Sequence, residues 1–245
     1  MISDKKNLKI RYENDGFILI KNFLKKKEIN ELRAELFNKI NKEKNKFKKR
    51  FINFTKNGSI NSLHGLDNFE CVKKIQKDKR VINSVSTILG RNYDEFGSEL
   101  FAKPAGTGLS VPIHQDNKYW CLSNGKAITM WLALDRSNIK NGGIFYYKGS
   151  HQLGLLEHEP SYAPGSSQKI KFTKGLVHFK KIFPSLNVGD CLIHNCLVVH
   201  GSNKNLTKNS RSGLTLRFKE KNNCVRNDLK KAYEKELKKQ LKGRK

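Results

Sequence analysis

The chain has 245 residues, a formal net charge of +27, 29% charged residues and 37% apolar residues. Apolar and aromatic residues recur along its whole length, which excludes an intrinsically disordered chain and allows one domain with a sizeable core. No apolar run approaches the ~18 residues of a membrane span, and the N-terminus lacks the apolar segment of a secretory signal. Its five cysteines are scattered, with no CxxC pair, which favours free thiols and a cytoplasmic location.

The positive charge is concentrated in two stretches, residues 25–50 and 229–245. One interpretation is an anionic partner, such as nucleic acid or an acidic lipid surface. The other is solvated helix faces in a chain that is rich in Lys and Asn throughout. Because the chain has no zinc-finger spacing and no RNP-type motif, we favour the second interpretation and expect neither a nucleic-acid nor a membrane partner.

The first part of the chain predicts one strand followed by helices. The segment GFILI, residues 16–20, is typical of a β-strand, and residues 26–46 follow with helical spacing of apolar residues. A second pair of helices is predicted at 68–78 and 79–90, with Gly90 as the C-cap. The apolar positions of the first helix are Ile29, Leu32, Leu36 and Ile40.

The pattern of the sequence changes from about residue 98, where short apolar runs alternate with Gly, Pro, Asn and Asp. This pattern is typical of short strands joined by turns. A polar, Pro- and Gly-containing insert at about 157–175 predicts a lid or surface loop, and the last twenty residues return to a Lys-rich helical pattern. We therefore expect a helical N-terminal segment packed against a β-sandwich or barrel-like core.

One short segment, VPIHQDNKYW at residues 111–120, carries two metal-binding side chains. On a β-strand, His114 and Asp116 would point to the same side, where an ordinary strand would carry apolar groups. His194 and His200 are the candidates for a third ligand. They lie about 20 Å apart on an unbroken strand, so one metal could not bind both, and His200, at the strand's end, is favoured.

Two histidines and one carboxylate leave three coordination positions of an octahedral metal open. This set is used by non-haem Fe(II) oxygenases, which need room for O2 and a bidentate co-substrate. Zinc hydrolases also use two histidines and a carboxylate, but their best-known signature is a helical HExxH, which this chain lacks. The pattern therefore favours iron over zinc.

Several segments resemble the phytanoyl-CoA dioxygenase family of Fe(II)- and 2-oxoglutarate-dependent oxygenases. The resemblance rests on HQD at 114–116, on His200 within GDCLIHNCLVVHGSNKN, and on Arg211 eleven residues further on. The opening segment at 12–36, the approach ELFAKPAGTGLSVPIHQD and the turn NGGIFYYKGSHQLG also resemble that family.

The resemblance implies a mainly β fold with flanking helices, whose core is a double-stranded β-helix, a jelly-roll of the cupin type. We expect one dioxygenase domain over residues 1–245. Its parts would be a mainly helical N-terminal buttress at 1–97, a jelly-roll core at 98–220 and a basic C-terminal helix at 221–245.

The resemblance also implies roles for individual residues. His114, Asp116 and His200 would bind Fe(II), and Arg211 would pair with the distal carboxylate of 2-oxoglutarate, which suits a guanidinium fork. Further residues expected at the 2-oxoglutarate pocket are Ser202, Trp131, Thr129, Leu100 and Lys103. Residues that could line the substrate site are Tyr119, Trp120 and His64.

The implied activity is hydroxylation of an unactivated C–H bond of a small, possibly anionic substrate. It uses O2 and converts 2-oxoglutarate to succinate and CO2. The retained Asp116 favours hydroxylation over halogenation, because halogenating relatives replace this carboxylate with a small residue. The family turn PGSH appears here as KGSH, with Lys148 in place of proline, from which we expect little effect. Two alternatives stay open: a non-catalytic cupin-like binding protein, and an oxygenase acting on nucleic acid or protein.

Overall fold

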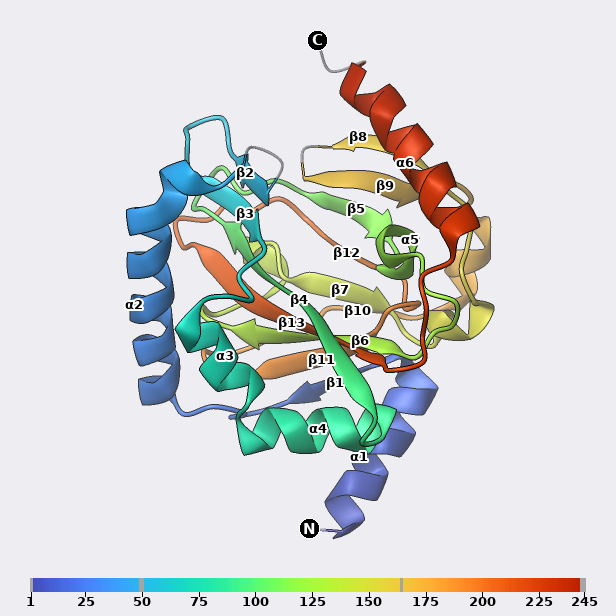
Figure 1. Ribbon diagram of the computed structural model, residues 1–245, viewed down its shortest axis with the longest axis horizontal. Coiled ribbons are helices and arrows are strands. Elements are labelled where there is room, and N and C mark those ends of the chain that lie inside the picture. The colour runs from blue at the N-terminus through green and yellow to red at the C-terminus, as the bar shows by residue number, and fades with distance from the viewer. Residues whose placement is uncertain (1, 49–50, 164, 243–245) are drawn as a thin grey trace.

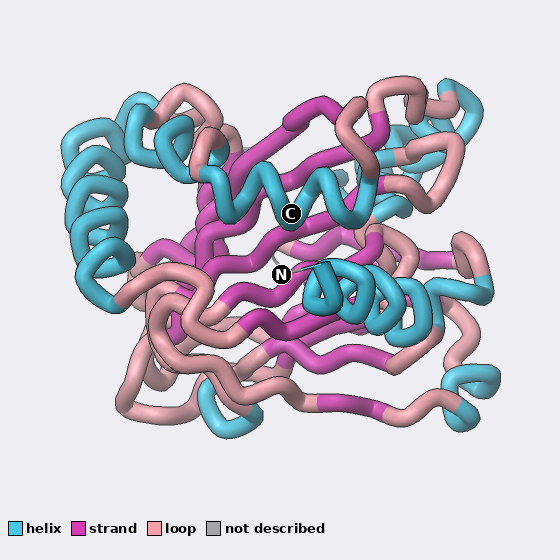
Figure 2. Tube along the Cα trace, turned by 90° about the horizontal axis from the view of Figure 1, so that it is seen from below, coloured by secondary structure: helices cyan, strands magenta, loops and turns pink. Residues whose placement is uncertain are grey.

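The computed structural model describes residues 2–48, 51–163 and 165–242 of the chain. Its helices flank a central set of strands (Figure 1), and a view turned by 90° shows the same arrangement (Figure 2). The helices are α1 (Ile2–Asp15), α2 (Lys26–Glu43), α3 (Glu70–Gln76), α4 (Lys79–Leu89), α5 (Asn117–Trp120) and α6 (Asn227–Lys242).

The strands form two main antiparallel sheets and one hairpin. In spatial order, the large sheet contains β1 (Phe17–Ile20), β11 (Cys191–Asn195), β6 (Ala127–Ala133), β13 (Arg211–Glu220), β4 (Tyr93–Lys103), β3 (Ile60–His64) and β2 (Ile52–Phe54). The small sheet contains β10 (Lys181–Ile182), β7 (Ile144–Tyr147), β12 (His200–Ser202) and β5 (Val111–His114). The hairpin consists of β8 (His158–Ala163) and β9 (Ser166–Ile170).

The two main sheets face each other, because Trp131 and Leu192 of the large sheet pack with Ile144 and Tyr146 of the small sheet. Apolar side chains from facing antiparallel sheets are the core of a sandwich. This arrangement confirms the expected mainly β jelly-roll with flanking helices.

Strand β13 shows how the sequence divides the two faces of the large sheet. Its even positions Leu214, Leu216 and Phe218 belong to a core shared with helices α2, α3 and α4. Its odd positions, from Arg211 to Arg217, point between the sheets, since successive side chains of a strand alternate in direction. The helices shield the outer face from water, while polar groups gather inside.

The N-terminal part contains more strand than the sequence indicated. Besides the expected strand β1 and the expected helices, residues 1–97 contribute β2 and β3 to the large sheet. Helix α1 was not expected from the sequence. Helix α4 does end as expected, since Gly90 has φ of 85° and its N–H donates to Ser86 O.

Two other segments differ in detail from expectation. The insert at 157–175 is a β-hairpin followed by a 3-10 turn rather than an irregular loop. The C-terminal helix starts at Asn227, six residues later than expected, and residues 243–245 lie outside the described residues. Within the described ranges, no helix combines the length and apolar character needed to cross a membrane.

Candidate metal centre

The first two candidate ligands come from the end of β5 and the turn that follows it. His114 is the last residue of β5, and Asp116 is the residue before α5. The expectation that both lie on one strand was therefore wrong. The chain turns at Gln115, and this turn brings the Asp116 carboxylate back toward the His114 ring.

The third ligand comes from β12, which pairs with β5 so that His200 lies directly opposite His114. The preceding strand β11 ends at Asn195, and the chain turns before β12 begins at His200. The ring centroids of His194 and His200 are consequently 4.7 Å apart. The separation of about 20 Å expected for an unbroken strand was wrong, although the choice of His200 as the third ligand agrees with the geometry.

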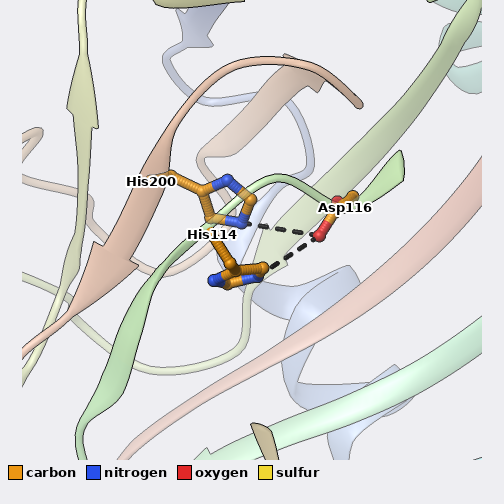
Figure 3. A group of neighbouring side chains, drawn as sticks. All are labelled: His114, Asp116 and His200. Atoms are coloured by element: carbon orange, nitrogen blue, oxygen red, sulfur yellow. Dashed lines mark ion pairs between the residues drawn. The ribbon is translucent and has the colours of Figure 1, made fainter. Parts of the chain in front are cut away.

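His114, Asp116 and His200 each present one ligand atom, and these atoms all lie within 4.8 Å of one another. The Oδ1 atom of Asp116 is 3.5 Å from His114 Nε2 and 3.6 Å from His200 Nε2 (Figure 3). Each imidazole Nδ1 lies within 3.0 Å of a backbone carbonyl two residues earlier, so Nδ1–H donates to that carbonyl. Both Nε2 lone pairs are thus free to bind a metal.

The electrostatics of the three groups fit a divalent cation. Burial lowers the pKa of His200 to about 3, with His114 also contributing, so the ring stays neutral as a metal ligand must be. Burial raises the pKa of Asp116, but the neighbouring imidazoles outweigh burial and hold the pKa well below its usual range. A half-buried carboxylate beside two imidazoles, with open space next to it, matches the donor set of a non-haem Fe(II) site.

The second oxygen of Asp116 is held by groups of the large sheet. Thr129 Oγ1 donates to Asp116 Oδ2 at 2.8 Å, and His194 Nε2 lies 3.1 Å from the same oxygen. Burial raises the pKa of Tyr146 well above its usual value, so its hydroxyl stays protonated and donates to His194 Nδ1 at 3.0 Å. His194 therefore carries its proton on Nε2 and donates it to Asp116. Sequence reasoning missed this role because it treated 191–200 as one strand.

A buried guanidinium and a buried amine lie at one end of the same cavity. Burial, with the charge of Arg211 also contributing, lowers the pKa of Lys103 to about 6, so Arg211 is the cation of the pair at neutral pH. Arg211 and Lys103 are directly paired across β13 and β4. The Arg211 guanidinium donates to Gly142 O at 2.5 Å and lies 5.3 Å from the ring centroid of Trp131. Lys103 Nζ donates to the carbonyls of Leu109 and Asn203. A buried guanidinium with an amine donor beside it suits a carboxylate, such as one of those of 2-oxoglutarate.

A cavity of about 300 Å³ connects the metal ligands with this cationic end. Of the residues expected at the co-substrate pocket, the structure places Arg211, Lys103, Ser202, Trp131 and Thr129 on its wall. The candidate substrate residues His64, Tyr119 and Trp120 also line it.

Leu100 differs from the expectation. Its side chain is fully buried in the core beneath the helices and does not line the cavity. The reason is the alternation along β4, in which Glu99, Phe101 and Lys103 share the inner face and Leu100 points outward.

Comparisons with known proteins show the family to which the chain is similar. The profile of the phytanoyl-CoA dioxygenase (PhyH) family matches residues 12–213. The peroxisomal phytanoyl-CoA dioxygenase of Mus musculus is 25% identical over 228 residues, which cover 84% of this chain and 66% of that protein. This chain thus matches just under two thirds of the length of its mouse relative.

Relatives named for another substrate show a similar identity. The ectoine dioxygenase of Streptomyces avermitilis is 24% identical over 84% of this chain and 76% of its own length. The crystal structure of EctD from S. alaskensis with 2-oxoglutarate and 5-hydroxyectoine superposes with a TM-score of 0.74 at 19% identity, covering 90% of this chain and 77% of that one. At this identity, the superposition shows a shared fold.

Proposed function

The chain belongs to the phytanoyl-CoA dioxygenase family, and from this premise we propose that it hydroxylates a small molecule while converting 2-oxoglutarate to succinate and CO2. The observation that carries the proposal is the convergence of His114, Asp116 and His200 in the cavity that also contains Arg211. The relatives named as phytanoyl-CoA and ectoine dioxygenases support the reaction class.

In this proposal the protein binds and orients, whereas bound Fe(II), with O2 and 2-oxoglutarate, supplies the oxidising chemistry. His114 and His200 would bind the iron through Nε2, and Asp116 would bind it through Oδ1. The fold shields the site from water, since His114, His200 and Arg211 are all buried.

The cationic end of the cavity would hold the carboxylate of 2-oxoglutarate that does not bind iron. Arg211 keeps its charge, since burial lowers its pKa only to about 10. Its contacts with Gly142 O and Trp131 fix the orientation of the guanidinium fork before the co-substrate arrives. Lys103 and Ser202 lie on the same wall and would complete the carboxylate site.

The test is anaerobic reconstitution with Fe(II) and 2-oxoglutarate, followed by the visible charge-transfer band of the complex. We expect His200→Ala to abolish the band, and Arg211→Ala to raise the 2-oxoglutarate concentration at half-saturation by about tenfold or more. Arg80→Ala, which removes a guanidinium paired with Glu28 and Asp78, is the matched control. Absence of the band, together with absence of iron-dependent succinate from 2-oxoglutarate, would overturn the proposal and favour the non-catalytic alternative.

A further inference from the structure

A second charged group lies on the cavity wall, away from Arg211 and Lys103. Arg217 is on the same face of β13 as Arg211, six residues further along, which corresponds to about 20 Å of strand. In the register of the large sheet, Arg217 is paired directly with Thr129, whose hydroxyl binds Asp116. The cavity therefore has a cationic group at each end, and this second one is next to the metal ligands.

The Arg217 guanidinium has few partners for a group that is so enclosed. Its side chain is 19% exposed, and its closest charged contact is an ion pair of 3.4 Å with Glu99. Its Nε is fully buried and has no hydrogen-bond partner among the residues that the structure describes. Buried donors of native proteins are almost always satisfied, by protein groups or by water, so this guanidinium has capacity for a further acceptor.

Two aromatic rings and a glycine of the paired strand lie against this guanidinium. It lies 5.3 Å from the ring centroid of Phe96 and 5.6 Å from that of Trp120. On the paired strand stands Gly97, where an added Cβ would be 2.0 Å from Arg217 Nη2. The register of β13 and β4 shifts directly after Arg217, as at a β-bulge, which commonly aims a side chain at a functional site.

Glu99 places a negative charge beside this positive one. His64 Nδ1 lies 2.5 Å from Glu99 Oε1, and both residues line the cavity. Burial raises the pKa of Glu99, but Arg217 and His64 outweigh burial and lower it, so the carboxylate stays ionised. The wall thus presents a carboxylate and a guanidinium side by side, which is the complement of a zwitterion.

We propose that Arg217 binds a carboxylate of the substrate and Glu99 its amino group, so that the enzyme acts on small amino acids or their close derivatives. The inference rests on the proposed oxygenase function and names its substrate class. A cavity of about 300 Å³ that must also hold 2-oxoglutarate favours a small substrate. A long hydrocarbon chain placed here would bury Arg217 and Glu99 against apolar groups without compensation.

The test compares free acids with their carboxamides. The Fe(II)- and 2-oxoglutarate-loaded protein is given the standard L-amino acids and their hydroxylated and N-methylated derivatives, each paired with its carboxamide, and palmitoyl-CoA as the contrasting class. Substrate-stimulated succinate formation is the readout. We expect at least one free acid to stimulate succinate formation about tenfold or more above its amide, because loss of a charge-assisted hydrogen bond has about that effect.

Three variants test whether the preference for the free acid depends on Arg217. Arg217→Gln should reduce the preference for the acid over the amide to near unity, and Gly97→Ala should do the same by displacing the guanidinium without removing its charge. Lys219→Gln, which removes a charge from the same strand beside Asp94, should preserve the preference. All three should keep the anaerobic 2-oxoglutarate band, which separates this inference from the proposed function.

The inference would be overturned if the wild-type protein shows a normal band but no free acid stimulates succinate formation more than its amide. The same holds if no compound of the panel stimulates succinate formation. Either result would leave the proposed function standing. Stimulation by palmitoyl-CoA alone would also overturn it. Loss of the band in the wild-type protein would instead count against the proposed function.

Discussion

His194 Nε2 lies 3.1 Å from Asp116 Oδ2, the carboxylate oxygen opposite the one that faces His114 and His200. The Tyr146 hydroxyl on His194 Nδ1 fixes the tautomer, so that Nε2–H points at the carboxylate. Such contacts orient a ligand and strengthen metal binding without touching the metal. His194 is therefore a positioning residue for the candidate iron site.

The first prediction is that His194→Phe weakens Fe(II) binding by about 10- to 100-fold, the usual effect of removing a partner behind a metal ligand. A phenyl ring preserves most of the packing against Tyr146 but removes the donor to Asp116. Competition with a chromophoric Fe(II) chelator measures the affinity directly. Tyr146→Phe should show a smaller loss, because His194 then keeps its contact with Asp116. An unchanged affinity in His194→Phe would refute the positioning role.

The second prediction concerns Gln115, which lies between the two ligands of the HQD segment and is fully buried. Its Nε2 donates to Gly154 O at 2.7 Å and to Leu197 O at 2.6 Å, and its Oε1 accepts from Leu156 N at 2.7 Å. Gln115→Leu leaves all three groups unpaired, at roughly 1–3 kcal/mol each. We expect the free energy of unfolding in urea to fall by about 3 kcal/mol or more.

The control for this prediction is the exposed Gln152, which lies in the same region of the fold. Gln152→Leu should change the unfolding midpoint little, since exposed substitutions usually lie within about 0.5 kcal/mol. Equal stability of the two variants would show that the Gln115 contacts do not hold the metal-binding turn together.

The candidate metal ligands could be predicted from the sequence, because their spacing and local motifs are themselves the signal. His114, Asp116, His200 and Arg211 were named from HQD, the distal histidine and the arginine beyond it. The short strands separated by turn residues predicted a β-sandwich or barrel-like core, and the resemblance to the phytanoyl-CoA dioxygenase family implied the jelly-roll. These features are local in the sequence, and local patterns can be recognised without knowledge of tertiary contacts.

The surroundings of the ligands could not be predicted in the same way, since they depend on how strands pair. Thr129 binds Asp116 only because a turn brings α5 against the large sheet. The break between β11 and β12 carries no Pro, and its signal in the sequence is the polar pair His194–Asn195 within an apolar run. From the sequence, Arg217 is an ordinary charged residue of a predicted strand. Only the strand register and the bulge place it at the cavity.

The third prediction concerns Gly213, over which the Trp131 ring lies. An added Cβ would be 2.0 Å from Trp131 Cε2, and Trp131 in turn contacts Arg211. Gly213→Ala should therefore displace the indole, reduce stability by about 1–3 kcal/mol, and weaken 2-oxoglutarate binding. Titration of the anaerobic charge-transfer band measures the binding, and thermal unfolding measures the stability.

Gly175→Ala is the matched control, because an added Cβ there meets no atom within 4 Å. It should leave both readouts unchanged. A Gly213→Ala protein with wild-type affinity for 2-oxoglutarate would show that the position of Trp131 does not matter to the co-substrate.

The last prediction follows from His158, which ties the β8–β9 hairpin to the metal-binding turn. Its Nδ1–H donates to Leu156 O at 2.8 Å, and its Nε2 accepts the Gln115 backbone N–H at 3.1 Å. Protonation of Nε2 would place two N–H groups against each other, and burial independently lowers the pKa of His158 to about 4. The ring is therefore neutral in the folded protein at pH values where an unfolded histidine is protonated.

The sign of the pH dependence follows from proton linkage. Between the unfolded pKa of about 6.5 and the folded pKa of about 4, the unfolded state binds more protons, so the free energy of unfolding falls as the pH falls. The contribution is fully present above about pH 6.5 and is lost toward pH 4, and it amounts to roughly 3 kcal/mol. His158→Gln lacks this group, so the stability difference between wild type and variant should shrink across that window in urea unfolding. Asp116 and His200 are present in both proteins, so their contributions to the free energy of unfolding cancel in the difference. As a control, His178→Gln at an exposed position should show the same change of unfolding free energy with pH as the wild type. A constant difference from pH 7 to pH 4 would mean that His158 is not held neutral by its contact with Gln115.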